Sequence, residues 1–363
     1  MHRRQFFIGS AAAALAATGV VPLAGLGGLA HAATAVPSIN VVAAIKALRI
    51  PSGPWAGGFV IAPAGRINWY FTNLGLLPVV QLLNAADRET CIRSYLDLYL
   101  RTVRSDGTIE DVNFPSGQST SGTYEMVPSD SDDSYAATLL SLANRYLRVS
   151  QNWSWWDANK AQLKQLAYSN LAVTAKSTGY TSVFQSPRSQ TNNIGYTMDN
   201  CEAYRGLRDF ASLLRDRGEA DEATYYDAFA TGIANGIAQA GFDAQRGGFT
   251  TGDHTRLAEV SFYPGTTCQV FPQAFGVTEL APYFDRADQF LETYSPGWAD
   301  GRYDAFPWAV LGFAAAKRGK FAQARTQMTM IEQKFVDNRG LVTINELGFY
   351  LRTRRVVKGL ADI

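Results

Sequence analysis

Two kinds of helical segment alternate from about residue 68 to the end of the chain, and this alternation constrains the fold more than any other feature. Segments of the first kind open with aromatic and polar residues and then become small and apolar on all sides. They begin near Asn68, Asp130, Thr197, Tyr263, Tyr303 and Ile344. Segments of the second kind are amphipathic and have one charged face. They cover residues 87–104, 156–176, 219–240, 285–294 and 320–336, and residues 38–49 can supply a sixth.

The two kinds of segment differ in how they can be buried. A helix that is apolar all round must pack inside an inner layer, whereas an amphipathic helix needs only one covered stripe. Six inner and six outer helices in alternation predict an all-α fold, an (α/α)6 toroid of six helical hairpins. No domain boundary is visible after residue 38, so residues 33–363 are expected to form a single domain.

The connections between the segments are unequal in length. Turns from an inner to an outer segment are short, whereas those that return are long and rich in glycine and aromatic residues. The long connections span residues 105–129, 177–196, 241–262 and 295–302, and residues 247–263 resemble a short β-hairpin. All of them must gather on one rim, where the inner helices begin. Loops concentrated at one end of a rigid scaffold predict a functional site there.

The first 32 residues have the pattern of a twin-arginine signal peptide. Arg3 and Arg4 precede an apolar stretch over residues 8–29, and Ala30-His31-Ala32 is a small-x-small cleavage pattern. Pro22 and nearby glycines interrupt the stretch, which favours cleavage over a membrane anchor. We therefore expect a periplasmic or secreted protein with no membrane span after signal cleavage.

Charge and residue usage exclude several classes of protein. The 33 Lys and Arg against 32 Asp and Glu give a formal net charge of +1, which implies no attraction to nucleic acid. After residue 32 the only histidine is His254, which argues against a Ser-His-Asp hydrolase and against a His-ligated metal. No phosphate-binding loop or dinucleotide motif occurs, so no cofactor and no metal are expected. Cys91, Cys201 and Cys268 are expected to be buried apolar residues. The oligomeric state stays open.

Acidic residues crowd the start of the second inner segment. Capping and the helix dipole explain one or two acids there, but not three aspartates within four positions. Crowded carboxylates in a cleft split their pKa values, so that one can hold a proton while another is ionised. The candidates for catalysis are Asp132, Asp133 and Glu125, and those for substrate binding are Tyr124, Asp130 and Tyr135.

The third inner segment opens with a second acidic group. Asp199 lies in its first turn, and Glu202 follows three residues later on the same helical face. Asp199 is a candidate for catalysis, with helix capping as the alternative. Aromatic rings beside amides and carboxylates suit a sugar, although packing is the more common role of any single ring. The further candidates for substrate binding are Trp69, Tyr70, Asn73, Asn200, Glu202, Tyr204, Arg205, Asp304, Trp308 and Glu346.

The alternation and these acidic residues together resemble the six-hairpin glycosidase superfamily. Residues 197–207 (TMDNCEAYRGL) are similar to the start of an inner helix in unsaturated glucuronyl and rhamnogalacturonyl hydrolases. That resemblance implies a general acid/base role for Asp199, and it implies that Asp132 or Asp133 matches the aspartate on the preceding inner helix. The histidines typical of those hydrolases are missing, which argues against an unsaturated uronide as substrate.

The expected function is an exported glycoside hydrolase that cleaves a poly- or oligosaccharide by carboxylate acid/base catalysis, with inversion favoured over retention. Four alternatives remain open at this point. The protein could bind glycans without cleaving them, or assist polysaccharide assembly on the same scaffold. A polysaccharide lyase would use a tyrosine as base. Asp130-Ser131-Asp132-Asp133 also resembles the DxDD motif of terpene cyclases, but their repeat motifs and second helical domain are absent.

Overall fold

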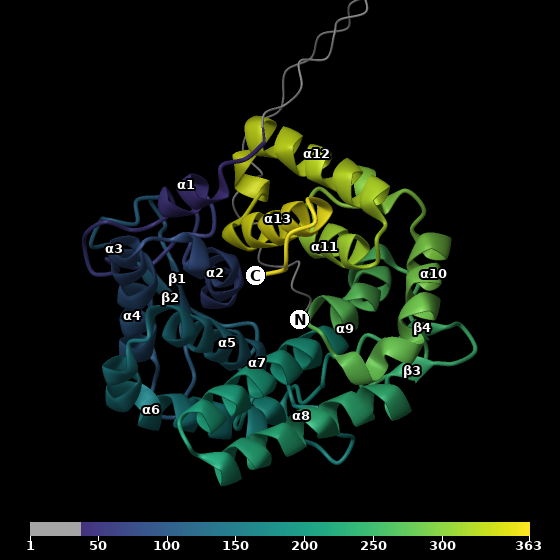
Figure 1. The fold of residues 1–363 in the computed structure, drawn as a ribbon, viewed down its shortest axis with the longest axis horizontal. Coiled ribbons are helices and arrows are strands. Elements are labelled where there is room, and N and C mark those ends of the chain that lie inside the picture. The colour runs from purple at the N-terminus through teal and green to yellow at the C-terminus, as the bar shows by residue number, and fades with distance from the viewer. Residues whose placement is uncertain (1–37) are drawn as a thin grey trace, which may run out of the picture. The chain divides into compact units, whose positions relative to one another are not determined.

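Helices in two concentric layers make up most of the described part of the chain (Figure 1). The computed structural model describes residues 38–363, so the predicted signal peptide of residues 1–32 and the first residues of the predicted domain lie outside the described residues. The inner helices are α2 (Trp69–Leu76), α5 (Asp133–Ser150), α7 (Thr197–Asp216), α9 (Phe271–Ala274), α11 (Ala309–Lys317) and α13 (Ile344–Val357). The outer helices are α1 (Val41–Lys46), α3 (Ala85–Asp87) with α4 (Ser94–Thr102), α6 (Trp153–Ala167), α8 (Ala220–Ala240), α10 (Phe284–Tyr294) and α12 (Phe321–Asp337).

The inner helices form a closed ring. Each packs on the next in chain order, and α13 packs on α2 to complete the circle. The all-α toroid predicted from the alternation is therefore confirmed. From the sequence, Trp153, Trp155 and Trp156 are expected to serve packing on the side of the short turns; Trp155 and Trp156 are buried in the core, and Trp153 is half-buried against it. The three cysteines are buried, as expected, and each is a free thiol.

Two inner segments differ from their predicted form. The fifth inner helix begins at Ala309 rather than near Tyr303, because Pro307 precedes Trp308, whose backbone adopts the left-handed conformation (φ +49°). The fourth is broken into a π-helical turn (Phe262–Thr266), a 3₁₀ turn (Thr267–Val270) and α9, with Pro264 and Pro272 inside this stretch.

Two short hairpins lie in the long connections. Strands β1 (Glu110–Asn113) and β2 (Glu125–Pro128) pair antiparallel, as do β3 (Phe242–Asp243) and β4 (Gly248–Phe249). The hairpin predicted over residues 247–263 is thus wrong in position. The carboxylate of Asp243 accepts hydrogen bonds from the backbone N–H groups of Gln245 and Arg246, which fixes the turn before residue 248.

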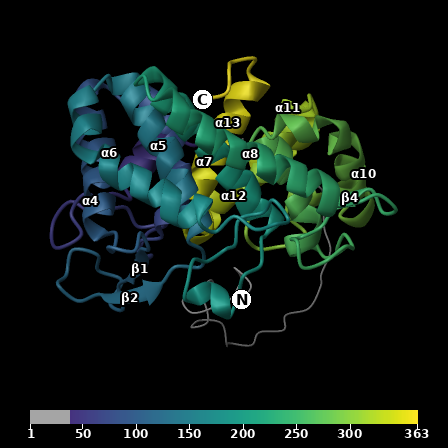
Figure 2. The same ribbon diagram turned by 90° about the horizontal axis from the view of Figure 1, so that it is seen from below.

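The hairpins and the C-terminus lie at opposite ends of this ring. Figure 2 shows β1 and β2 below the helices and the C-terminal residues above them. The rim that carries the long connections is also the end at which the inner helices begin, as predicted. Among residues 38–363 we find no helix whose length and apolar content would allow it to cross a membrane.

Candidate active site

The first turns of α5 and α7 bring three acidic side chains together at this rim. Asp133 is completely buried, and Asp199 and Glu202 are nearly so. The carboxyl group of Asp133 accepts a hydrogen bond from the backbone N–H of Ser134 (2.7 Å). Burial, reinforced by the charges of Asp199 and Glu202, raises the pKa of Asp133 well above its ordinary value. Burial and the neighbouring acids therefore favour the protonated form of Asp133.

Hydrogen bonding around Thr181 agrees with a protonated Asp133. The Thr181 hydroxyl lies 2.9 Å from Oδ2 of Asp133 and 3.1 Å from Oδ1 of Asn200, but it has only one proton to donate. If Asp133 donates its proton to Thr181, Thr181 can donate to Asn200, and every oxygen is satisfied. Thr181 belongs to the connection of residues 177–196, and no sequence motif marked it as part of the site.

Asn200 holds this connection against α7. Its side-chain oxygen accepts a hydrogen bond from the backbone N–H of Thr181 (2.7 Å), and its amide donates to the carbonyl oxygens of Thr181 (3.2 Å) and Tyr196 (3.0 Å). Asn200, predicted to bind substrate, thus positions the loop that covers Asp133.

Glu202 links α7 to α2. Its Oε1 accepts a short hydrogen bond from the hydroxyl of Tyr70, a side chain that is itself buried. The contact spans the inner face of α5, which lies between these two helices in the ring. Two predicted site residues from distant parts of the sequence therefore meet on the inside of the toroid.

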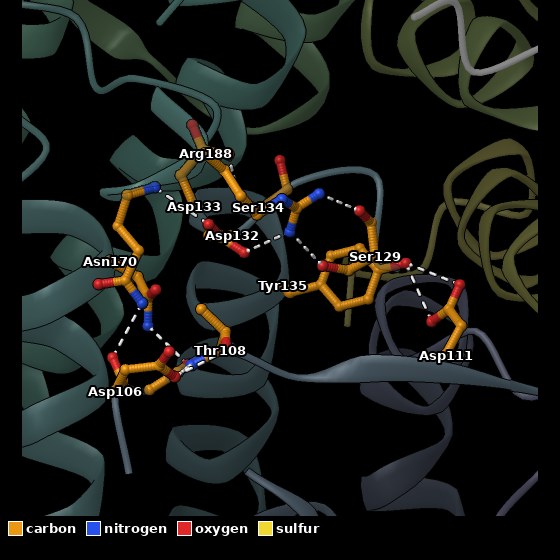
Figure 3. Close-up of polar contacts among 12 residues, drawn as sticks. Asp106, Thr108, Asp111, Ser129, Asp132, Asp133, Ser134, Tyr135, Asn170 and Arg188 are labelled. Carbon is orange, nitrogen blue, oxygen red and sulfur yellow. Dashed lines mark hydrogen bonds and ion pairs between the residues drawn. The ribbon is translucent and has the colours of Figure 1, made fainter. Parts of the chain in front are cut away.

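Asp132 differs from its neighbour Asp133 in what it contacts. Its carboxylate pairs with Arg188 at 3.1 Å and accepts the backbone N–H of Gln185 at 3.0 Å. Arg188 also donates to Oγ of Ser129, so it joins the connection of residues 177–196 to the start of α5 (Figure 3). Burial raises the pKa of Asp132, and the charge of Arg188 opposes this shift. Asp132 anchors a loop, whereas Asp133 faces the other acids.

Asp111 on β1 carries a buried carboxyl group that the sequence patterns did not single out as part of a site. Asp111 accepts hydrogen bonds from Nδ2 of Asn68 (2.7 Å) and from the hydroxyl of Tyr135 (3.1 Å; Figure 3). Burial raises the pKa of Asp111 to about 7, although Arg66 lowers it, and the charge of Asp130 adds to the rise. The only indication of Asp111 in the sequence was that an aspartate occurs within residues 105–129, one of the connections predicted to lie on the rim. Tyr135 and Asp130 were both predicted to bind substrate. In the structure Tyr135 donates a hydrogen bond to Asp111, and Asp130 lies close enough for its charge to act on Asp111.

Glu125 and Tyr124 lie away from this buried group. Both are exposed at the outer hairpin, where Glu125 accepts a hydrogen bond from Asn113 (3.3 Å) and Tyr124 contacts the ring of Trp55. Glu125 is thus an exposed carboxylate of the hairpin, whereas Asp133 and Asp199 are buried at the helix starts.

Two predicted binding residues on α2 serve packing instead. Trp69 is fully buried, and its Nε1 donates to the carbonyl oxygen of Glu110 (2.7 Å). Asn73 is fully buried too and accepts a hydrogen bond from the hydroxyl of Tyr95 (2.8 Å). The apolar face of α2 turns these side chains toward α4 and α5 rather than toward the rim.

Tyr204 and Arg205 also lie away from the rim. The Tyr204 hydroxyl donates to Glu279 (2.7 Å), and Arg205 pairs with Asp209 one turn further along α7. Both residues follow Asp199 by more than one helical turn, so they point to other parts of the ring.

Half-buried aromatic rings stand at the rim near the start of α11. The ring of Trp308 stacks on that of Tyr263, with centroids 4.5 Å apart and planes 25° from parallel, and Phe306 meets Trp308 edge-on. The indole Nε1 of Trp308 donates to Asp304 (3.1 Å). Asp304 and Trp308 were predicted to bind substrate, whereas Tyr263 and Phe306 were not singled out. The group combines flat apolar faces with a carboxylate.

Glu346 lies at the start of α13 and is buried. Its carboxyl group accepts hydrogen bonds from the backbone N–H of Ala309 and from Nδ2 of Asn345 (3.1 Å). Burial raises the pKa of Glu346 to about 8, although these two hydrogen bonds lower it. Glu346 is therefore protonated at neutral pH.

Replacing Glu346 by Gln should flatten the pH dependence of stability. The pKa of the folded state lies above that of the unfolded state, so the unfolded chain loses its proton first, and stability falls as pH rises from about 4.5 to about 8. Between pH 5 and pH 9 the free energy of unfolding of the wild type should fall by on the order of 4 kcal/mol more than that of the variant. Urea unfolding at both pH values measures this difference. Asp337→Asn, at the exposed end of α12, should keep the wild-type slope, and equal slopes for wild type and Glu346→Gln would contradict the assignment.

Comparison with known proteins adds a structural likeness. No family model and no curated protein matches the sequence. Among solved structures, a rhamnosidase from Klebsiella oxytoca with rhamnose bound has a TM-score of 0.59 at 13% sequence identity. The likeness covers 88% of this chain and 63% of that chain, so the described toroid spans less than two thirds of the rhamnosidase. At this identity the likeness concerns the fold, and it agrees with the predicted toroid.

Proposed function

We propose that the protein is an exported glycoside hydrolase that cleaves a poly- or oligosaccharide by carboxylate acid/base catalysis. The observation that carries the proposal is the group of buried acids Asp133, Asp199 and Glu202, which lie in the first turns of neighbouring inner helices at the loop-bearing rim. Their mutual charge and burial raise the pKa of Asp133. Hydrolysis of a glycosidic bond needs one carboxyl group that holds a proton and one that is ionised. The fold likeness to a rhamnosidase supports the same reaction class.

In this proposal Asp199 is the catalytic residue and Asp133 is a positioning residue. Both carboxyl oxygens of Asp133 have protein partners, and its side chain has no exposed surface, so it cannot touch a substrate. Its proton removes one negative charge from the immediate neighbourhood of Asp199. Burying one ionised carboxylate costs less free energy than burying two. In the proposal the ionised group is Asp199.

Inversion of the anomeric centre is the stereochemical part of the proposal. Asp199 lies on α7, and α13 lies on the opposite side of the ring (Figure 1). Glu346 on α13 is buried with both carboxyl oxygens hydrogen-bonded, as Asp133 is, so by the same criterion it does not touch substrate, and the acid of the proposed pair is another group on that side. A base and an acid that face each other across a bowl leave room for the attacking water. Nuclear magnetic resonance of the first-formed sugar distinguishes inversion from retention, because it detects the anomer before mutarotation.

Export belongs to the same proposal. The twin-arginine pattern of residues 1–32 supports a periplasmic or secreted protein. Determination of the N-terminus of the exported protein tests this, and an intact Met1 in the purified mature fraction would contradict it.

A reducing-end assay tests hydrolysis directly. The purified protein is incubated with a panel of polysaccharides and nitrophenyl glycosides that includes a rhamnoside. New reducing ends or released nitrophenol support hydrolysis, and the active member of the panel identifies the sugar. An unsaturated product with ultraviolet absorbance would instead indicate a lyase, and isoprenoid cyclisation without sugar release would indicate a terpene cyclase.

The second candidate function is glycan binding without cleavage. The observation that favours it is the strong internal bonding of Asp132 and Asp133, which would serve a purely structural role equally well. A glycan that raises the melting temperature of wild type and Asp199→Asn alike, without any release of sugar, would support this candidate or a role in polysaccharide assembly.

Replacing Trp308 by Ala should weaken substrate binding more than turnover. The Trp308 ring stacks on Tyr263 at the rim, and a sugar face stacked on such rings gains about 0.5–1.5 kcal/mol per contact. We expect KM to rise about 3- to 10-fold with a smaller change in kcat. Tyr225→Ala, at an exposed aromatic of α8, is the control and should leave KM unchanged. An unchanged KM in Trp308→Ala would remove this group from the binding site.

A further inference from the structure

A cavity lies inside the ring of inner helices, at the end opposite the hairpins. It has a volume of about 160 Å³, and five of the six inner helices line it. The C-terminal residues Asp362 and Ile363 form part of its wall, on the side where the C-terminus lies in Figure 2. One water molecule needs only about 10–15 Å³ measured in this way, so the cavity can hold a small ligand.

Basic side chains surround the cavity. Arg145, Arg205 and Arg352 line it, and Lys317 at the end of α11 lies close enough to Arg352 to feel its charge. The acidic residues that face the same space are Glu202, Asp209 and Asp362. Ile363, which also lines the cavity, carries the carboxylate of the chain end. The cavity therefore brings four cations together with four carboxylates if Glu202 is ionised, and with three if Glu202 holds a proton.

Two of the four cations already have carboxylate partners. Arg205 binds Asp209 through two N–H groups, one at 2.9 Å. Arg352 binds Asp362 in the same bidentate way, at 2.9 and 2.7 Å. The side-chain carboxylate of Asp362 enters the basic group from the chain segment that follows α13, in the way that a bound anion would.

The other two cations lack such a partner. Among residues 38–363, neither Arg145 nor Lys317 forms an ion pair: Arg145 reaches Oε1 of Gln81 at 3.4 Å, and Lys317 donates to the carbonyl oxygen of Gln273 at 3.2 Å. Burial, together with the nearby charge of Arg352, lowers the pKa of both. Arg145 is half-buried and Lys317 is exposed. The charge of Asp362 acts on both and that of Asp209 on Arg145, but neither carboxylate is bonded to them directly.

Helix dipoles do not account for these positions. A basic residue in the last turn of a helix is stabilised by the dipole, and Lys317 is such a residue. Arg145 and Arg205 are not, because α5 continues to Ser150 and α7 to Asp216. Asp209 and Asp362 act on Arg145 from a distance, and each is bonded to another arginine, so a direct anionic partner of Arg145 would have to enter from the cavity.

We propose that this cavity is a binding site for a small oxyanion such as phosphate or sulfate, held between Arg145, Arg205 and Arg352. The planar guanidinium group presents paired N–H donors that match the oxygens of such an anion. Asp362 competes for the same donors on Arg352. The site is separate from the proposed hydrolase function and lies behind Glu202, on the far side from the rim.

Isothermal titration of the purified protein with inorganic phosphate, at constant ionic strength, tests the site. The wild type should bind phosphate, and Arg145→Gln should bind it at least about 10-fold more weakly, because a charged hydrogen-bond donor is lost. Asp362→Asn should bind several-fold more tightly, because the competing carboxylate is gone. Arg101→Gln, an exposed basic residue of α4, should match the wild type. A sugar phosphate is titrated in parallel, since its binding would show that the anion can be part of a glycan.

Binding should also raise the melting temperature of the wild type, by about 3 °C at 100-fold excess over Kd. Equal affinities for wild type and Arg145→Gln, or no binding by the wild type, would overturn the proposal. If Arg145→Gln does not fold, Asp362→Asn decides alone, because an unchanged affinity there would contradict competition at Arg352. None of these readouts depends on sugar hydrolysis, so failure of the anion site and failure of the proposed function can be told apart.

Discussion

Replacing Asp199 by Asn should lower kcat/KM by at least about 10³-fold, near the upper part of the range for acid/base groups. Asparagine has the shape of aspartate but can neither accept a proton from water nor carry charge in the site. The fold should persist, because the substitution removes a charge from beside the buried Asp133 rather than adding one. We expect the melting temperature to change by less than about 2 °C.

Two variants make this measurement specific. Asp216→Asn changes an exposed aspartate at the end of the same helix and should keep full activity. Asp133→Asn mimics the protonated state that we infer for Asp133, so it should lose much less activity than Asp199→Asn. Activity near the wild-type level in Asp199→Asn would remove Asp199 from catalysis. A larger loss in Asp133→Asn than in Asp199→Asn would reverse the two roles.

The architecture was predictable because it depends on local sequence. Whether a helix is apolar all round or on one stripe can be read from about four turns of chain, and this property alone separates inner from outer helices. The meeting of Asp133 and Asp199 follows from it, since successive inner helices begin at the same rim.

The different roles of Asp132 and Asp133 could not be predicted in the same way. The two residues are adjacent at the start of α5, where a rotation of about 100° per residue sends one side chain toward the loop and the other toward α7. Which one faces inward depends on where the helix begins, and sequence patterns place helix ends only to within a few residues. Asp111 and Thr181 escaped notice because their loops are positioned by tertiary contacts.

The left-handed Trp308 has a similar explanation. Nothing in the local sequence requires a bulky residue to adopt φ +49°, a conformation that costs about 1 kcal/mol or more without glycine. Its stacking on Tyr263 and the hydrogen bond of its indole to Asp304 compensate for this cost. The fifth inner helix therefore begins later in the chain than its sequence pattern predicts.

Replacing Gly206 by Ala should destabilise the fold by about 3 kcal/mol or more, as overpacking in a closed interface does. Gly206 lies where α7 crosses α5. A Cβ atom there would sit 2.5 Å from the carbonyl oxygen and 2.6 Å from the Cα of Ala137, both backbone atoms that cannot rotate away. Thermal and urea unfolding measure the loss. Gly232→Ala in α8 is the matched control, because its Cβ would meet nothing within 4 Å.

The control should change stability in the opposite direction, with a gain of up to about 1 kcal/mol from the higher helix propensity of alanine. The contrast matters for function as well as for stability. The close approach of α5 and α7 at Gly206 and Ala137 lies about two turns from Asp199 and one turn from Asp133. It therefore sets the separation of the two helix starts, where the charges of Asp199 and Glu202 help to raise the pKa of Asp133. Forcing the helices apart should therefore lower kcat/KM in Gly206→Ala even at temperatures where the protein stays folded. A Gly206→Ala protein as stable and as active as Gly232→Ala would show that the acidic group does not depend on this helix crossing.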